Sequence, residues 1–157
     1  MCCGISISYR DFPESLIEKY GLQDRIVARA ENADREVRFL YHENSALIPA
    51  WIGGELGIYL WGNREDASPR LPMTGWCREE NLEAGRWAWL KPEPVVIPAT
   101  LGMENGRWFQ IYEGIRGILV RDSRNRPHVY MLTEEASHYY HIMTGRIRMP
   151  VLIGQQL

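Results

Sequence analysis

The chain of 157 residues has few cysteines, almost no lysine and no long apolar run. Its three cysteines, two of them adjacent, make a poor disulfide framework and lack the spacing of a zinc site. We therefore expect a reducing, cytoplasmic setting. No apolar run approaches the roughly 20 residues that a membrane helix needs, and no signal-peptide segment follows the N-terminus. The sequence accordingly predicts no membrane partner.

The charge distribution is uneven along the chain. The net charge of −2 argues against a generic nucleic-acid binder. Residues 1–106 hold 11 basic and 16 acidic side chains, whereas residues 107–157 hold 7 basic and 4 acidic ones, so the C-terminal third is net positive. Only Lys19 and Lys91 among the basic residues are lysines. Arginine can bind a phosphate through two parallel N–H donors, which lysine cannot, but a GC-rich genome produces the same excess of arginine.

Length and composition predict one soluble domain that spans residues 1–157. Hydrophobic residues make up 45% and charged residues 24% of the chain, which is ordinary for a globular protein. A helix is expected at 13–20, where Pro13 stands in the first turn and Gly21 follows the last one. Further helices are expected at 23–32 and 134–143. Strand-like runs occur at 4–9, 36–41, 57–61, 94–99, 107–112, 115–121, 128–133 and 149–153. The pattern predicts an α+β fold with a curled, barrel-like, mostly antiparallel sheet and a few short helices.

The first four residues, Met1-Cys2-Cys3-Gly4, carry the most informative chemistry. A small second residue usually permits removal of the initiator methionine, which leaves Cys2 with a free amine next to its thiol. Both groups are nucleophiles that titrate near neutral pH. Such a 1,2-aminothiol forms an imine with an aldehyde and then closes it through sulfur into a five-membered thiazolidine. Chance alone also explains a cysteine at this position.

The other two cysteines have simpler interpretations. If the first strand is regular, Cys3 faces away from Cys2 and is packed. Cys77 is most simply a small core residue. The six tryptophans are mostly expected in the core, with one or two available as stacking platforms for unpaired bases.

Several segments, taken in order, resemble the SOS-response-associated peptidase (SRAP) family, whose members protect abasic sites in single-stranded DNA. The family's opening Met-Cys-Gly and the Pro-Glu helix that ends in Gly-Leu resemble residues 1–4 and 13–22. Four further matches follow in register; they are Trp61-Gly62 and the segments 76–80, 97–105 and 146–150. The resemblance therefore covers most of the chain.

The resemblance implies that Cys2 is the nucleophile and that Glu104 is a general acid or base. A carboxyl group can pass protons during ring opening and imine formation. It further implies that Arg78 and Arg148 face the DNA backbone. The partner is then single-stranded DNA with abasic sites, and no cofactor or metal is expected.

Two positions depart from the family pattern. The family asparagine falls on Trp76, with Asn81 five residues too late, and the family histidine falls on Arg146. Arginine cannot act as a base, but Arg146 could hold a phosphate or favour the Cys2 thiolate. We expect Trp76 to offer DNA a stacking surface instead of a polar group.

A pair of histidines one helical turn apart, His138 and His141, most simply lies on a solvated helix face. Two imidazoles without further ligands do not make a metal site.

Three functions stay open at this point. The chain is an abasic-site sensor that crosslinks through Cys2, a degenerate relative that binds single-stranded DNA or another ligand without chemistry, or a thiol peptidase that uses Cys2 and Glu104 on its own Met1. The sequence leaves the oligomeric state undetermined.

Overall fold

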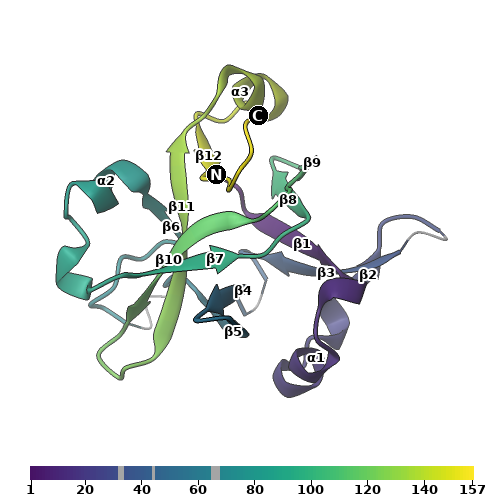
Figure 1. The fold of residues 1–157 in the computed structure, drawn as a ribbon, viewed down its shortest axis with the longest axis horizontal. Helices are drawn as coiled ribbons and strands as arrows, with labels where there is room; N and C mark the ends of the chain where they lie inside the picture. The colour runs from purple at the N-terminus through teal and green to yellow at the C-terminus, as the bar shows by residue number, and fades with distance from the viewer. Residues whose placement is uncertain (32–33, 44, 65–67) are drawn as a thin grey trace.

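The computed structural model describes residues 1–31, 34–43, 45–64 and 68–157, and in them the chain forms two β-sheets with short helices around them (Figure 1). The first sheet is antiparallel throughout its described pairings. Its strand order is β2 (Ile26–Ala28), β3 (Arg35–Leu40), β1 (Gly4–Ser8), β8 (Leu101–Glu104) and β9 (Arg107–Gln110). This order places the start of the chain between segments about 40 and 100 residues further on.

The second sheet closes on itself. Its order is β10 (Ile115–Arg121), β7 (Glu93–Ile97), β4 (Leu47–Ile52), β5 (Glu55–Trp61) and β11 (Pro127–Glu135), and β11 pairs again with β10. β11 also pairs with β6 (Trp76–Arg78) and β12 (Arg148–Pro150). The pairings of β11 with β5 and with β6 are parallel, and the others described are antiparallel. Together with the helices, this arrangement confirms the predicted α+β class and its curled, mostly antiparallel sheet.

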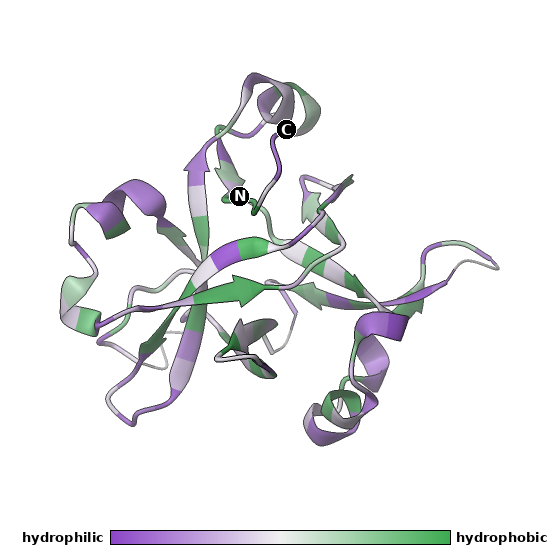
Figure 2. Ribbon diagram, viewed as in Figure 1, coloured by the Kyte–Doolittle hydropathy of each residue, from purple (hydrophilic) through white to green (hydrophobic). Residues whose placement is uncertain are grey.

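One hydrophobic cluster joins the two sheets. Ile5 and Phe39 from the first sheet pack in the same cluster as Ile48, Ile97 and Val129 from the second. Figure 2 shows hydrophobic residues along the central strands, β7 most evenly, while α2 is largely hydrophilic. The shared cluster ties the first sheet to the closed barrel.

Three α-helices occur in the described ranges, and two of them, α1 and α3, begin or end at residues suited to the position. α1 (Glu14–Tyr20) follows Pro13 and ends at Gly21, whose φ of 63° suits glycine, so the helix predicted at 13–20 is confirmed. α2 is Glu79–Glu83. α3 (His138–Thr144) starts after Ser137, whose hydroxyl accepts a hydrogen bond from the Tyr140 amide at 3.1 Å. None of these helices is long and apolar enough to cross a membrane.

The helix predicted at 23–32 is wrong. Gln23–Arg25 forms one 3-10 turn, and the chain then enters β2, where Ile26 pairs with Val37; residue 32 lies outside the described ranges. Tertiary pairing outweighs the weak helical propensity of this polar stretch.

Other expected boundaries shift as well. Because β11 continues to Glu135, opposite Arg148, the helix predicted at 134–143 starts only at His138. β12 occupies Arg148–Pro150, earlier than the strand predicted at 149–153. The predicted strand runs leave out β2, β4, β6 and β8.

Candidate functional site

Glu104 is a buried carboxylate that binds the N-terminus of the chain. It ends β8, and the pairing of Gly4 with Met103 brings residues 1–3 beside it. The α-amine of Met1 lies 3.0 Å from its Oε1, and the Tyr140 hydroxyl donates to the same oxygen at 3.2 Å. The Nε of Arg146 lies 3.9 Å from Oε2. The carboxylate therefore faces an amine, a hydroxyl and a guanidinium, which equips it to hold or transfer protons.

Tyr140 acts as a fixed donor to this carboxylate. Burial raises the pKa of its hydroxyl far above the ordinary value, and the nearby Cys2 and Glu104 add to that effect. The hydroxyl therefore stays protonated and donates at any working pH. Sequence reasoning missed Tyr140, because its place in the site depends on tertiary contacts of α3 with Glu104 and Phe109.

The adjacent cysteines occupy different environments, and the expectation that Cys3 is the packed one is wrong. Cys2 is fully buried, and its thiol donates to the Gly4 carbonyl at 3.3 Å. Burial, with a smaller contribution from the charge of Glu104, raises the pKa of the Cys2 thiol to about 12. Cys3 is only partly buried and lines the pocket described below. The main chain of Cys3 still bonds to both neighbouring strands, donating to the Met103 carbonyl and accepting from the Tyr41 amide, but its side chain borders the pocket and is therefore not fully covered.

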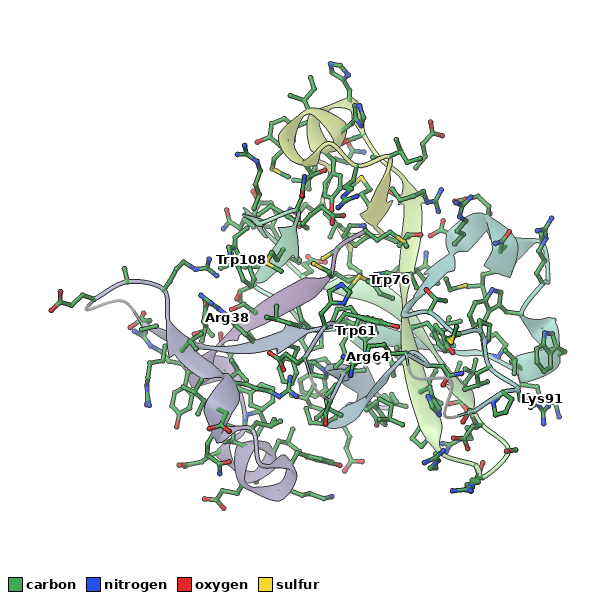
Figure 3. All side chains as sticks on the ribbon, turned by 180° about the vertical axis from the view of Figure 1, so that it is seen from behind. Arg38, Trp61, Arg64, Trp76, Lys91 and Trp108 are labelled. Atoms are coloured by element: carbon green, nitrogen blue, oxygen red, sulfur yellow. The ribbon has the colours of Figure 1, made fainter. Side chains whose placement is uncertain are left out.

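Trp76 is attached directly to the N-terminal segment. Its indole Nε1 donates to the carbonyl of Cys2 at 2.9 Å. Its ring stacks on Tyr41 with centroids 4.6 Å apart and planes 11° apart, and Trp61 meets it edge-on at 6.0 Å. Figure 3 shows Trp61 and Trp76 side by side in the middle of the molecule. The half-buried Trp76 thus positions the chain at Cys2 and presents an aromatic edge to the pocket.

A pocket of about 330 Å³ opens beside Glu104. The residues that line it come from five separate segments of the chain. They are Met1, Cys3, His42, Trp76, Glu104, Asn105, Gly106 and Arg146. Glu104, Trp76 and Arg146 of the predicted site residues therefore meet here, whereas Cys2, between Met1 and Cys3 in the chain, is buried and does not line the pocket.

The pocket holds a histidine and an asparagine that sequence reasoning missed. His42 follows β3, in a turn where Arg64 donates to the Tyr41 carbonyl at 2.8 Å. Asn105 and Gly106 form the β8–β9 turn with φ of 51° and 76°, and the Asn105 amide donates to the Thr144 carbonyl at 3.0 Å. The antiparallel pairing of the predicted strands 4–9 and 36–41 was the available signal for His42, because it places residue 42 beside residues 2–3.

Arg78 and Arg148 do not line this pocket. Arg148 donates to the Thr133 carbonyl at 2.8 Å and pairs with Glu80 at 2.9 Å, so its guanidinium joins α2 to the β11–β12 edge. Arg78 is exposed where α2 begins.

His138 and His141 are exposed on α3, as expected for a solvated helix face. Among the residues that the structure describes, no group of three or more histidine, cysteine or acidic side chains is arranged to hold a metal ion.

Comparison with family models, with curated proteins and with solved structures finds no match to this chain. The resemblance to the SRAP family therefore stays a prediction, supported by the residues quoted above.

Proposed function

We propose that, once Met1 is removed, this chain protects abasic sites in single-stranded DNA by crosslinking to them through Cys2 in the cytoplasm. The observation that carries this proposal is the contact between the N-terminal amine and the buried carboxylate of Glu104. Aldehyde capture by an amine needs a proton acceptor and donor within hydrogen-bond reach, and Glu104 meets that requirement.

Removal of Met1 changes which amine faces the carboxylate. The new terminus starts one residue, about 3.8 Å, further along the chain. A buried carboxylate is costly without a positive partner, so Glu104 attracts the Cys2 amine. When the Cys2 amine moves to Glu104, the Cys2 side chain moves with it from its buried position into the pocket.

The reaction then needs no cofactor. The Cys2 amine adds to the C1′ aldehyde of the ring-opened deoxyribose, and the carbinolamine loses water to give an imine. Glu104 takes a proton from the attacking nitrogen and returns it to the departing hydroxyl. The Cys2 sulfur then adds to the imine carbon while its proton passes to nitrogen. One thiazolidine and one water are the products.

The surroundings of the pocket suit a single-stranded ligand. Trp76 offers an aromatic surface beside the site, and Arg146, which is half exposed, offers a guanidinium to phosphate. We expect single-stranded DNA to bind more tightly than duplex, with affinity that falls as salt rises. Arg78 and Arg148 lie outside the pocket, so the crosslink itself does not require them.

The test is a denaturing gel of abasic single-stranded DNA after incubation with protein whose intact mass shows that Met1 is gone. Tags stand at the C-terminus, because an N-terminal extension removes the free amine. We expect a heat-stable adduct with the processed protein, none with Cys2→Ala and none with the chain that keeps Met1. Cys3→Ala is the matched control and should crosslink normally. Fully processed protein that binds DNA without an adduct would support the degenerate binder instead.

A second candidate is self-processing, in which Cys2 and Glu104 remove Met1. The same contact favours it, since the amine of the residue to be released is the group bound by Glu104. Synthesis in a translation system without methionine aminopeptidase tests it. Loss of Met1 in the wild-type chain, and its retention in Cys2→Ser, would support this activity.

A further inference from the structure

The outer face of the first sheet carries a cluster of basic and aromatic side chains that lies outside the pocket. Ile5, Val37, Phe39 and Phe109 point into the core, so the residues that alternate with them point outward. On the outward face, β1 presents the small residues Gly4, Ser6 and Ser8, of which Gly4 and Ser6 are themselves buried. Ser6 pairs with Arg38, and the row from Gly4 runs through Met103 to Trp108. The floor between Arg38 on β3 and Trp108 on β9 therefore consists of the small residues of β1 and of Leu101 and Met103 on β8.

Two arginines are held over the ring of Trp108. The guanidinium carbon of Arg29 lies 4.3 Å from the ring centroid, and that of Arg38 lies 5.0 Å from it. Figure 3 shows Arg38 and Trp108 close together on this face. Because the two guanidiniums occupy the indole, Trp108 serves here to orient arginines.

Glu36 also holds both guanidiniums in place through hydrogen bonds. Its Oε1 accepts from Arg29 Nη2 at 2.8 Å and from Arg38 Nε at 2.7 Å. Burial acts to raise the pKa of Glu36, but the hydrogen bonds and positive charges around it, that of Arg38 first and those of Arg29 with it, together outweigh burial and hold the pKa below its ordinary value. The carboxylate is therefore ionised at neutral pH.

This cluster keeps one unit of positive charge. Two guanidiniums against one carboxylate leave a net charge of +1. Within the described part of the chain, the hydrogen bonds of both arginine side chains go to Glu36 and leave further N–H groups of each fork available. Guanidinium groups that are held in place and keep unused N–H donors are suited to bind the non-bridging oxygens of a phosphodiester.

The cluster adjoins the pocket. Trp108 stands two residues after Gly106, which lines the pocket, and two residues of a strand span about 7 Å. Gly4, at the start of the floor, directly follows Cys3.

We propose that Arg29, Arg38 and Trp108 form a phosphodiester-binding subsite for the single strand that leaves the pocket on one side. The direction of that strand rests on the proposed function, whereas the affinity for phosphate does not.

The first experiment measures equilibrium binding of an undamaged, fluorescent single-stranded oligonucleotide by anisotropy over a range of salt. Relative to wild type, the double variant Arg29→Gln/Arg38→Gln should bind about tenfold more weakly at low salt. The slope of log affinity against log salt should fall in size by about 0.7 for every phosphate that the variant no longer neutralises. The control Arg124→Gln removes a surface charge in the distant β10–β11 turn and should change little. Equal behaviour of the double variant and the control overturns the proposal.

Glu36→Gln separates binding from folding. This variant loses two ion pairs yet adds one net positive charge to the subsite, so it should bind the oligonucleotide more tightly than wild type. A purely structural role for the cluster predicts weaker binding, and that result also overturns the proposal.

The second experiment uses abasic oligonucleotides extended only on the 5′ side or only on the 3′ side. The double variant should slow crosslinking with one of them and leave the other unchanged. Equal effects on both contradict a subsite on one side of the pocket. If no adduct forms with any substrate, the proposed function fails, while the binding measurement still decides the subsite.

Discussion

The α-amine of Met1 and the carboxylate of Glu104 form an ion pair of 3.0 Å between the chain's first residue and the end of β8. Glu104 is buried, so the amine supplies much of the positive charge that the carboxylate needs. The other cation nearby, Arg146, lies farther away at 3.9 Å and is half exposed. Removal of Met1 would therefore take the nearest cation away from Glu104.

Thiol labelling should show directly whether Cys2 is protected while Met1 is present. Burial raises the pKa of both Cys2 and Cys77 to about 12, so at pH 8 only about one in ten thousand of either thiol is ionised. With Met1 present, iodoacetamide should modify Cys3 first and the other two only on unfolding, as read by peptide mass mapping. In the processed chain Cys2 should react much faster while Cys77 stays protected. Unchanged protection of Cys2 after processing would contradict its movement into the pocket.

The carboxylate of Glu104 should control the rate of the crosslink. In the processed protein, Glu104→Gln should slow single-turnover adduct formation by about 10²–10⁴-fold, because an amide cannot transfer the proton. The residual rate reflects the intrinsic reactivity of the aminothiol. Tyr140→Phe keeps the carboxylate and removes only its hydroxyl donor, so its effect should be smaller. A normal rate for Glu104→Gln, with folding verified by circular dichroism, would remove Glu104 from the mechanism.

Local signals in the sequence were sufficient for part of the fold. Pro13 and Gly21 delimit α1 correctly because helix ends depend on backbone preferences of neighbouring residues. The helix prediction for 23–32 was wrong because the conformation there is set by the pairing of Ile26 with Val37, and local propensity carries no information about that pairing.

The site was harder to predict because it is assembled by long-range pairing. Glu104 meets the N-terminus through the register of Gly4 with Met103, a separation of about 100 residues. The segment resemblance nominated Glu104, Trp76 and Arg146, which share the pocket, but it also nominated Arg148, which pairs with Glu80 instead. The placement of His42 follows only once the pairing of β1 with β3 is known.

The hydrogen bond from Trp76 to the Cys2 carbonyl should be measurable as stability. Trp76→Phe keeps an aromatic ring on Tyr41 but loses the 2.9 Å hydrogen bond. We expect a loss of about 1 kcal/mol in the free energy of unfolding, seen as a melting temperature lower by about 2–4 °C. Trp89→Phe is the control, because Trp89 is exposed and should tolerate the change. Equal shifts in the two variants would show that the hydrogen bond contributes nothing.

Asp122 should govern the acid stability of the closed barrel. It is buried at the β10–β11 turn, where Oδ2 accepts from Ser68 Oγ at 3.0 Å, His128 Nε2 at 2.9 Å and Arg126 Nε at 2.9 Å. Burial alone would raise the pKa of Asp122, but the hydrogen bond from His128, together with those from Arg126 and Ser68, holds it well below the ordinary value. The carboxylate therefore joins the segment at Ser68 to the β10–β11 hairpin while it is ionised.

The sign of the pH dependence follows from that lowered pKa. An aspartate in the unfolded chain has a pKa of about 3.9, so its contribution to stability is fully present above about pH 5 and is lost as the pH falls further through the folded-state value. Asp122→Asn should cost about 1–3 kcal/mol at pH 7, because one of the carboxylate oxygens becomes an amide group that cannot accept the hydrogen bonds from buried donors. Urea unfolding at pH 7 and at pH 3.5 measures both effects. Wild type should lose more stability than the variant between the two pH values, and equal losses would show that other carboxylates cause the acid sensitivity.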